Sequence, residues 1–279
     1  MNQKYYSNGK LLFTGEYLVL DGANALAFPT KFGQSMSVTK INEPKIIWKS
    51  FNCNDEIWLH CEFLINEIEL PQNKIGDEKD RLISILREVK KLNPKFLNET
   101  NGYCIITKLD FARNWGLGSS STLISNISKW TNVDPFQLLD ATFGGSGYDI
   151  AAAQRNAPIL YAKALNEYHI TELSINWGFT NQIFFVHLNK KQNSRNGIFK
   201  YQKLKNNNQE VIGRINELTK TICHCQSLLE FELVIDEHEQ LISTIIQQKT
   251  VKELLFNDYN GSIKSLGAWG GDFILATGS

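Results

Sequence analysis

One stretch of the sequence indicates the fold: Asn114-Trp115-Gly116-Leu117-Gly118-Ser119-Ser120-Ser121-Thr122. It lies between an apolar run at 102–109, typical of a buried strand, and a pattern from 119 to about 130 that is typical of a helix. Two glycines let the backbone come close to a ligand, and the start of a helix carries partial positive charge. The stretch predicts a phosphate-binding loop, with an ordinary turn before a helix as the alternative.

The hydroxyl groups of residues 119–122 can serve two purposes. They could cap the helix, or one of them could bind a Mg²⁺ ion held by phosphates, because Mg²⁺ takes oxygen ligands. Two familiar nucleotide-binding patterns do not occur. The chain has no Gly-x-x-x-x-Gly-Lys-Ser/Thr sequence, and no Gly-x-Gly-x-x-Gly follows a first strand. P-loop enzymes and dinucleotide-binding folds are therefore excluded.

A second glycine-rich segment, Gly144-Gly145-Ser146-Gly147-Tyr148-Asp149, precedes the helix-forming residues 150–153. A carboxylate at a helix start is favoured by the helix dipole and stays ionised near neutral pH. Asp149 could accept a proton from a hydroxyl group that is being phosphorylated, or orient that group. The alternative is that Asp149 only caps the helix.

A third segment, residues 265–273, places three glycines just ahead of a strand at 273–276. Taken alone it predicts a flexible turn. It supports a functional interpretation only together with the two segments described above.

The amino-acid composition argues against some classes of protein function. The 279 residues are 42% hydrophobic and 21% charged, and Lys+Arg and Asp+Glu both number 29, so no net charge attracts nucleic acid or an anionic membrane. No stretch approaches the roughly 18 to 20 apolar residues of a membrane span. Five scattered cysteines fit reduced thiols. We expect a cytoplasmic enzyme that binds neither nucleic acid nor membrane and is a monomer or homodimer.

Cys223-His224-Cys225 invites a zinc interpretation. It lies within an apolar helical pattern, where residues two apart point to different faces. Buried structural thiols are the better interpretation there.

The remaining pattern predicts alternating strands and helices, without internal repeats or low-complexity linkers. We expect one mixed lobe before about Leu165 and a second after it. The expected strands are 10–28 as a hairpin around Asp21-Gly22, 35–41, 45–51, 56–63, 102–109, 158–165, 182–188 and 273–276; the expected helices are 77–92, 119–130, a segment from 149, and 206–248.

With these motifs in view, the sequence resembles the GHMP kinase superfamily, especially mevalonate and phosphomevalonate kinases. Residues 7–17, which contain Gly9-Lys10 and Thr14-Gly15-Glu16-Tyr17, are similar to its first motif, 114–122 to its second, and 265–273 to its third. The resemblance implies an α+β fold of two lobes: 1–164 similar to domain 2 of ribosomal protein S5, and 165–279 ferredoxin-like. Two departures stand out: Asn114-Trp115 replaces a proline-rich lead-in, and the chain ends soon after the third motif.

The resemblance also implies site residues. Lys10 and Asp149 would be catalytic, and Ser120 would bind Mg²⁺, with Asp140 as a second ligand. The alternative for Lys10 is a solvated lysine on an edge strand, for Glu16 a surface ion pair, and for Arg195 a basic solvent loop. The implied ATP-binding residues are Gly116, Leu117, Gly118, Ser119, Ser120, Ser121 and Thr122, and the implied substrate-binding residues are Glu16, Ser194, Arg195, Gly267, Ala268 and Gly270.

The implied activity is transfer of the γ-phosphoryl group from Mg-ATP to a small molecule, mevalonate or phosphomevalonate, in isoprenoid precursor synthesis. Two alternatives remain open. One is a non-catalytic homologue that binds nucleotide or metabolite; the other is the related ATP-dependent diphosphomevalonate decarboxylase, which tends to carry Ala where Gly118 stands.

Overall fold

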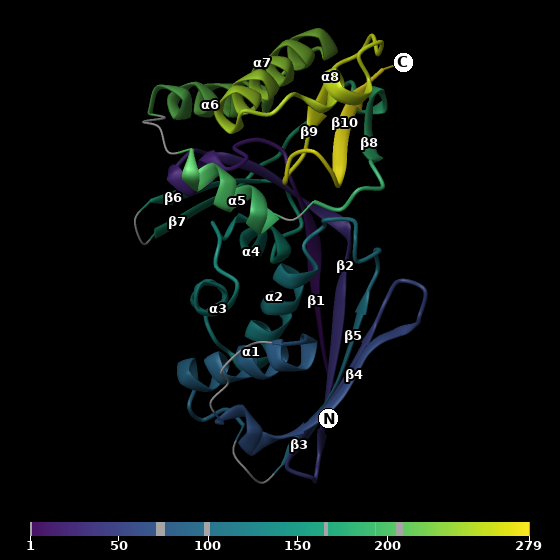
Figure 1. Ribbon diagram of the computed structural model, residues 1–279, viewed down its shortest axis with the longest axis vertical. Helices are drawn as coiled ribbons and strands as arrows, with labels where there is room; N and C mark the ends of the chain where they lie inside the picture. Colours follow the sequence, from purple (N-terminus) through teal and green to yellow (C-terminus); the bar gives the residue numbers. More distant parts are fainter. Residues whose placement is uncertain are drawn as a thin grey trace. The chain divides into compact units, whose positions relative to one another are not determined.

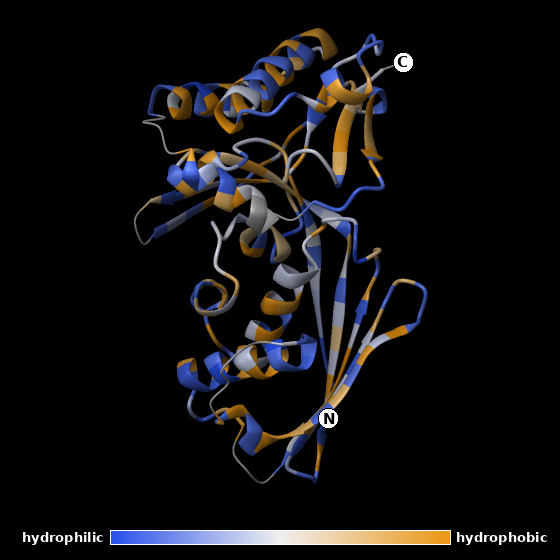
Figure 2. Cartoon of the chain, in the orientation of Figure 1, coloured by the Kyte–Doolittle hydropathy of each residue, from blue (hydrophilic) through white to orange (hydrophobic). Residues whose placement is uncertain are grey.

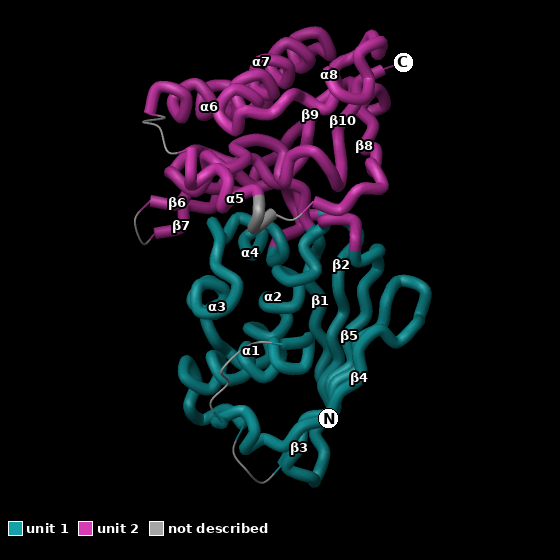
Figure 3. The backbone as a smooth tube through the Cα atoms, viewed as in Figure 1, with its two compact units in different colours: residues 1–9, 30–113, 117–154 teal, residues 10–29, 114–116, 155–279 magenta. Residues whose placement is uncertain are grey.

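The computed structural model describes residues 2–70, 76–97, 101–164, 167–192, 194–204 and 209–278 (Figure 1). These residues form two compact units that are not consecutive in sequence (Figure 3). Unit 1 comprises residues 1–9, 30–113 and 117–154; unit 2 comprises 10–29, 114–116 and 155–279. The division into lobes at residue 164/165 stays a prediction, but both units draw on the N-terminal third of the chain.

Unit 1 contains helices and most of a mixed sheet, in which some strand pairs are parallel and others antiparallel. Strand β3 (Lys45–Phe51) pairs with β4 (Ile57–Leu64) antiparallel and with β5 (Gly102–Leu109) parallel. Strand β5 also pairs antiparallel with residues 34–41 of β2 (Ala25–Ile41). The strands at 45–51 and 102–109 confirm the predicted ranges.

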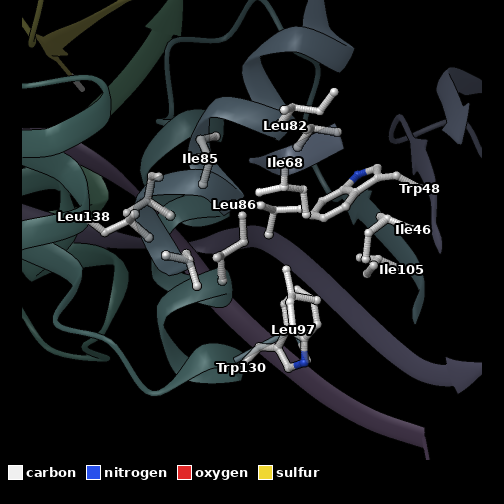
Figure 4. Packing of buried hydrophobic residues seen from close by; sticks show 14 of the residues in the cluster. Ile46, Trp48, Ile68, Leu82, Ile85, Leu86, Leu97, Ile105, Trp130 and Leu138 are labelled. Carbon is white, nitrogen blue, oxygen red and sulfur yellow. The ribbon is translucent and has the colours of Figure 1, made fainter. Parts of the chain in front are cut away.

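The helices of unit 1 are α1 (Glu78–Leu92), α2 (Ser119–Thr131), α3 (Pro135–Thr142) and α4 (Tyr148–Ala153). Helix α1 begins where the sequence predicts, because the Asp77 side chain accepts a hydrogen bond from the N–H of Asp80. The apolar faces of the helices close over the sheet in one core. Figure 4 shows Trp48, Ile46 and Ile105 from the strands packed with Leu82, Ile85 and Leu86 from α1.

Unit 2 contains strand pairs from both ends of the chain. Residues 25–27 of β2 pair with β6 (Ile159–Ala164), which pairs with β7 (Glu167–Glu172). A separate sheet has the order β8 (Ile183–His187), β10 (Phe273–Thr277), β9 (Ile263–Ser265), all antiparallel. Strand β1 (Asn2–Leu12) pairs with β2 and contributes residues to both units.

The helices of unit 2 are α5 (Ser194–Lys203), α6 (Gln209–Ile222), α7 (Leu228–Ile246) and α8 (Val251–Leu255). Apolar residues of α5, α6 and α7 pack into two clusters, one of which includes Phe13 and Leu26 from the start of the chain, and Val251 of α8 packs against β9 and β10 (Figure 2). None of the helices among the described residues has the length and apolar character needed to cross a membrane.

Two sequence-based element predictions hold only in part. The stretch predicted as helical at 206–248 forms two helices, α6 and α7, separated at residues 223–227, where Ser227 caps the second helix by accepting from the N–H of Glu230. The hairpin predicted at 10–28 is present, because β1 pairs with β2, but its connection contains a short 3₁₀ helix, Leu18–Asp21, and its strands extend from Asn2 and to Ile41.

Candidate functional site

The loop before α2 ends in a helix start without a side-chain cap. Gly118 is the N-cap residue, with a left-handed backbone (φ 87°), and its carbonyl accepts from the N–H of Thr122 at 3.0 Å. No side chain caps this helix. The first N–H groups of α2 are thus the type of donor that binds an anion at a helix N-terminus.

The residues with hydroxyl groups after Gly118 differ in their exposure to solvent. Ser121 Oγ donates to the carbonyl of Gly118 (2.8 Å), and Thr122 Oγ1 lies 3.0 Å from Gln34 Oε1; both residues are buried. Ser120 is exposed. Of these three residues, Ser120 therefore has the hydroxyl that a ligand in solution can reach, whereas Ser121 and Thr122 secure the helix start.

Gly9 and Lys10 of β1 run along the same loop. Within unit 1, a Cβ atom at Gly9 would lie 3.0 Å from the carbonyl oxygen of Leu117. Within unit 2, Lys10 Nζ donates to the carbonyl of Gly116 at 3.0 Å. Lys10 is 9% exposed, so the alternative of a solvated edge-strand lysine is wrong. An ammonium group beside this loop is a ready counter-charge for phosphate.

A carboxylate from the third motif reaches the loop as well. A Cβ atom at Gly116 (φ 70°) would lie 2.3 Å from Asp272 Oδ2, so only glycine fits against this carboxylate. Asp272 is 7% exposed. Sequence analysis gave Asp272 no role; its place at the end of the Gly-Gly-Asp segment was the available signal.

Glu16 lies in the interior of unit 2 and not at its surface. Its Oε1 accepts from Lys264 Nζ at 2.6 Å, and both side chains are 0% exposed. Burial raises the pKa of Glu16, and the Lys264 charge opposes that rise. The ion pair considered from the sequence exists, but it is buried. A substrate contact by Glu16 stays a prediction.

Two neighbouring residues of α7 extend this buried cluster. The His238 Nε2 atom accepts from the N–H of Gly15 at 3.1 Å, and the Glu239 carboxylate accepts from Ser265 N (3.0 Å) and Oγ (2.7 Å). Burial is the largest cause of both pKa shifts: it lowers the pKa of His238 well below 6.5 and raises that of Glu239 to about 7. Sequence reasoning missed these residues because partners so far apart leave no local pattern.

The two predicted acidic residues of unit 1 lie on different helices. Asp149 is in the first turn of α4, where Gly147 is the N-cap, so the interpretation of Asp149 as the cap is wrong. Its Oδ1 accepts from the N–H of Ile150 at 3.0 Å. Asp140 is an exposed residue of α3. Within the described ranges, no group of three or more His, Cys, Asp or Glu residues could hold a metal ion.

The third motif forms the loop between β9 and β10. Gly267 and Gly270 have left-handed backbones (φ 66° and 85°), and a Cβ atom at either would have no neighbour closer than 3.8 Å, so the loop has free space at both. Ala268 is buried. Ser194 and Arg195 begin α5, and their side chains lie outside the described part of the structure, so their predicted role stays a prediction.

The Cys223-His224-Cys225 segment directly follows the end of α6. The thiols of Cys223 and Cys225 contact the carbonyl oxygens of Thr219 and Thr221 at 3.1 and 3.5 Å. Burial raises the pKa of each thiol to about 11, which keeps both protonated at neutral pH. These contacts agree with structural thiols.

Comparison with solved structures places this geometry in a known fold. The chain is similar to mevalonate kinase of Methanococcus jannaschii (TM-score 0.72, 14% identity, 100% of this chain and 91% of that one). It is equally similar to Streptococcus pneumoniae phosphomevalonate kinase in complex with phosphomevalonate and AMPPNP (0.72, 14%, 98% and 91%). This chain has the GHMP kinase fold. That agreement confirms the GHMP kinase fold implied by the resemblance of the three motifs, and the fold type of each lobe stays a prediction.

The GHMP kinase fold carries more than one substrate class among these structures. Lactococcus lactis galactokinase complexed with galactose is also similar (TM-score 0.71, 14% identity, 99% of this chain and 85% of that one). No protein-family model matches the sequence, and neither does any curated protein. The similarity therefore establishes the fold and leaves the substrate to be argued from the site.

Proposed function

We propose that this protein is an ATP-dependent small-molecule kinase that transfers the γ-phosphoryl group of Mg-ATP to mevalonate or phosphomevalonate. The fold supports phosphoryl transfer as the reaction class, because mevalonate, phosphomevalonate and galactokinase structures share it. A fold alone does not determine an activity, so the proposal depends on the residues of the candidate site.

The observation that carries the proposal is the meeting of three distant stretches at Gly116. Its carbonyl accepts from Lys10 Nζ, its Cα faces Asp272, and helix α2, which has no side-chain cap, begins three residues further along the chain. Phosphoryl transfer needs positioning and neutralisation of charge more than covalent chemistry. A fixed ammonium group and a row of N–H donors supply both.

In the proposed mechanism Lys10 neutralises charge on the transferred group and Asp149 orients the acceptor hydroxyl or takes its proton. The Ser120 hydroxyl is available to hold Mg²⁺, because it is exposed at the start of α2. Asp140 is the proposed second ligand. A Mg²⁺ ion held there would offset the negative charge of the phosphates.

The choice of mevalonate or phosphomevalonate as acceptor rests on two features. The Thr14-Gly15-Glu16-Tyr17 and Gly270-Gly271-Asp272 segments resemble those of phosphomevalonate kinase more than those of galactokinase. The free space at Gly267 and Gly270 gives the third motif room beside a ligand. Arg195 is the residue proposed to pair with an acceptor carboxylate or phosphate.

A coupled assay of ADP formation tests the proposal over mevalonate, phosphomevalonate, homoserine, galactose and buffer alone. We expect Lys10→Met and Asp149→Asn each to lower turnover by several orders of magnitude without loss of folding. Lys4→Met, an exposed lysine of the same strand, is the matched control and keeps wild-type turnover. Near-normal turnover by either variant would overturn its assigned role.

Two other outcomes point to the alternatives. Release of carbon dioxide from diphosphomevalonate would identify a decarboxylase. Saturable binding of ATP without ADP formation for any acceptor would identify a non-catalytic binding protein.

A further inference from the structure

Asp272 lies at the end of a glycine-rich turn, and backbone hydrogen bonds fix its position. Its backbone is left-handed (φ 53°), which is uncommon for a residue other than glycine. The N–H of Asp272 donates to the carbonyl of Lys190 at 2.7 Å, and its own carbonyl accepts from the N–H of Leu188 at 2.8 Å. These bonds fix the residue to the segment that follows β8.

The two oxygens of the Asp272 carboxylate have different surroundings. Oδ1 accepts from the N–H of Gln192 at 3.1 Å. Oδ2 lies against the Cα of Gly116, whose carbonyl accepts from Lys10 Nζ. An acidic and a basic side chain, both at most 9% exposed, thus contact the same glycine of the predicted phosphate loop.

The charges around Asp272 favour an ionised carboxylate although burial does not. Burial has the largest effect and raises the pKa of Asp272; the hydrogen bond from Gln192 and the charge of Lys10 both lower it, followed by smaller effects of His187 and Lys191. Since Lys10 and Asp272 both contact Gly116, the positive charge of Lys10 lies near this carboxylate and favours its ionised form.

We propose that Asp272 is a positioning residue for phosphoryl transfer, which holds the Lys10 ammonium group and the Gly116 carbonyl in the arrangement that receives the phosphates. The proposal rests on the proposed kinase function. Lys10 touches the transferred group in that mechanism, and Asp272 acts through Lys10.

A lysine needs such a partner because its charge sits at the end of a flexible four-carbon stem. A neutral carbonyl such as that of Gly116 holds an ammonium group less strongly than a carboxylate does, so a nearby carboxylate restricts it before the nucleotide binds. Ordering a catalytic group in advance lowers the entropic cost of reaching the transition state. Loss of the Asp272 charge should therefore slow the chemical step and leave ATP affinity largely unchanged.

Asp272→Asn is the decisive variant, because asparagine has nearly the same size, tolerates a left-handed backbone and can still accept from Gln192. Only the charge is lost. Asp272→Gly, which fits the same backbone, is a second variant in case the first folds poorly. Asp258→Asn, at an exposed aspartate of unit 2, is the control and keeps wild-type rates.

The experiment measures single-turnover and steady-state rates of the full chain with γ-labelled ATP, Mg²⁺ and the best acceptor of the panel. We expect Asp272→Asn to lower kcat by about 10- to 100-fold, with KM for ATP changed less than about threefold. We expect Asp272→Asn combined with Lys10→Met to be slower than Lys10→Met alone by less than about threefold, because one residue acts through the other.

Each contrary result has a clear meaning. A kcat of Asp272→Asn within about threefold of wild type overturns the proposal, and so does a double variant slowed further by threefold or more, since the two residues then act independently. A wild-type protein that transfers phosphate to no acceptor overturns the proposed function itself and this role with it.

Discussion

Gly116 is the residue whose replacement tests the site most directly. We expect Gly116→Ala to lower kcat/KM by about 100-fold or more, because its Cβ would lie 2.3 Å from Asp272 Oδ2 and would displace the carboxylate or the loop. Phosphoryl-transfer kinetics measure the loss.

Gly144→Ala is the matched control for backbone strain. Gly144 has nearly the same φ (65° against 70°), but a Cβ atom there would meet nothing within 4 Å. Both variants should lose about 1 kcal/mol of stability from the left-handed backbone. Equal kinetic losses in the two would show that strain, and not contact with Asp272, determines the effect.

Glu239 provides a test through pH. Because its pKa rises from 4.5 to about 7 in the fold, the fold favours its protonated form. Its contribution to stability is fully present below pH 4.5 and is lost as the pH rises through about 7. Glu239→Gln mimics the protonated form, so its stability relative to wild type should grow by about 3 kcal/mol between pH 4.5 and pH 7 and above.

Urea unfolding of both proteins at several pH values measures this difference. His238 has the opposite dependence, since its lowered pKa removes stability as the pH falls below 6.5; it is present in both proteins and largely cancels in the comparison. A difference that stays flat over this range would contradict the raised pKa of Glu239.

Local sequence could point to some candidate residues of the site and not to others. Lys10 and the loop at Gly116 were candidates because glycine, lysine and a helix start have local signatures, and the structure shows the two in contact. The ion pair of Glu16 with Lys264 joins residues 248 positions apart, and the sequence around either residue does not indicate its partner. Whether a carboxylate faces solvent or the interior depends on such long-range packing.

At the scale of elements, Lys264 joins three pieces of unit 2: β9, the turn after β1, and α7. Its ammonium group contacts Glu16 and lowers the pKa of Glu239 against the larger effect of burial. We expect Lys264→Met to lower the free energy of unfolding by about 3–5 kcal/mol, because it leaves a buried carboxylate without a counter-charge.

The double variant Lys264→Met, Glu16→Gln separates charge from packing. Removing the negative partner as well should restore part of the stability in urea unfolding. A double variant less stable than Lys264→Met would show that the buried pair contributes mainly through shape.

The predictability of elements followed the strength of their local signals. Helix α1 combines a helical apolar repeat with an Asp77 cap and a stop at Asn93-Pro94, and it was predicted correctly. The break between helices α6 and α7 within the predicted helical stretch was missed, because no glycine or proline marks residues 223–227. Strand β7 has alternately half-buried and exposed residues and was missed, since it has no continuous apolar run.

At the scale of the whole molecule, a ligand that binds only the folded protein raises its thermal stability. We expect Mg-ATP at about 100 times its Kd to add about 2.7 kcal/mol, which corresponds to a rise in Tm of about 5 °C for a chain of this size. Differential scanning fluorimetry measures the shift, with ADP-free buffer and Lys10→Met as comparisons. No shift at saturating Mg-ATP would contradict nucleotide binding.

The fold as a whole was predictable because three short motifs in the right order specify it more strongly than any single element does. The acceptor was not, since its pocket depends on side chains from separate segments.

The strand β1 leaves unit 1 after Gly9 and enters unit 2 at Lys10, and Phe13 and Leu26 belong to the core of unit 2. A gene divided between codons 164 and 165 would consequently give a first fragment that keeps all of unit 1 and a second, 165–279, that lacks Phe13 and Leu26 from its own interior. Expressed alone, the second fragment should be insoluble; expressed together, the two should complement each other and recover activity.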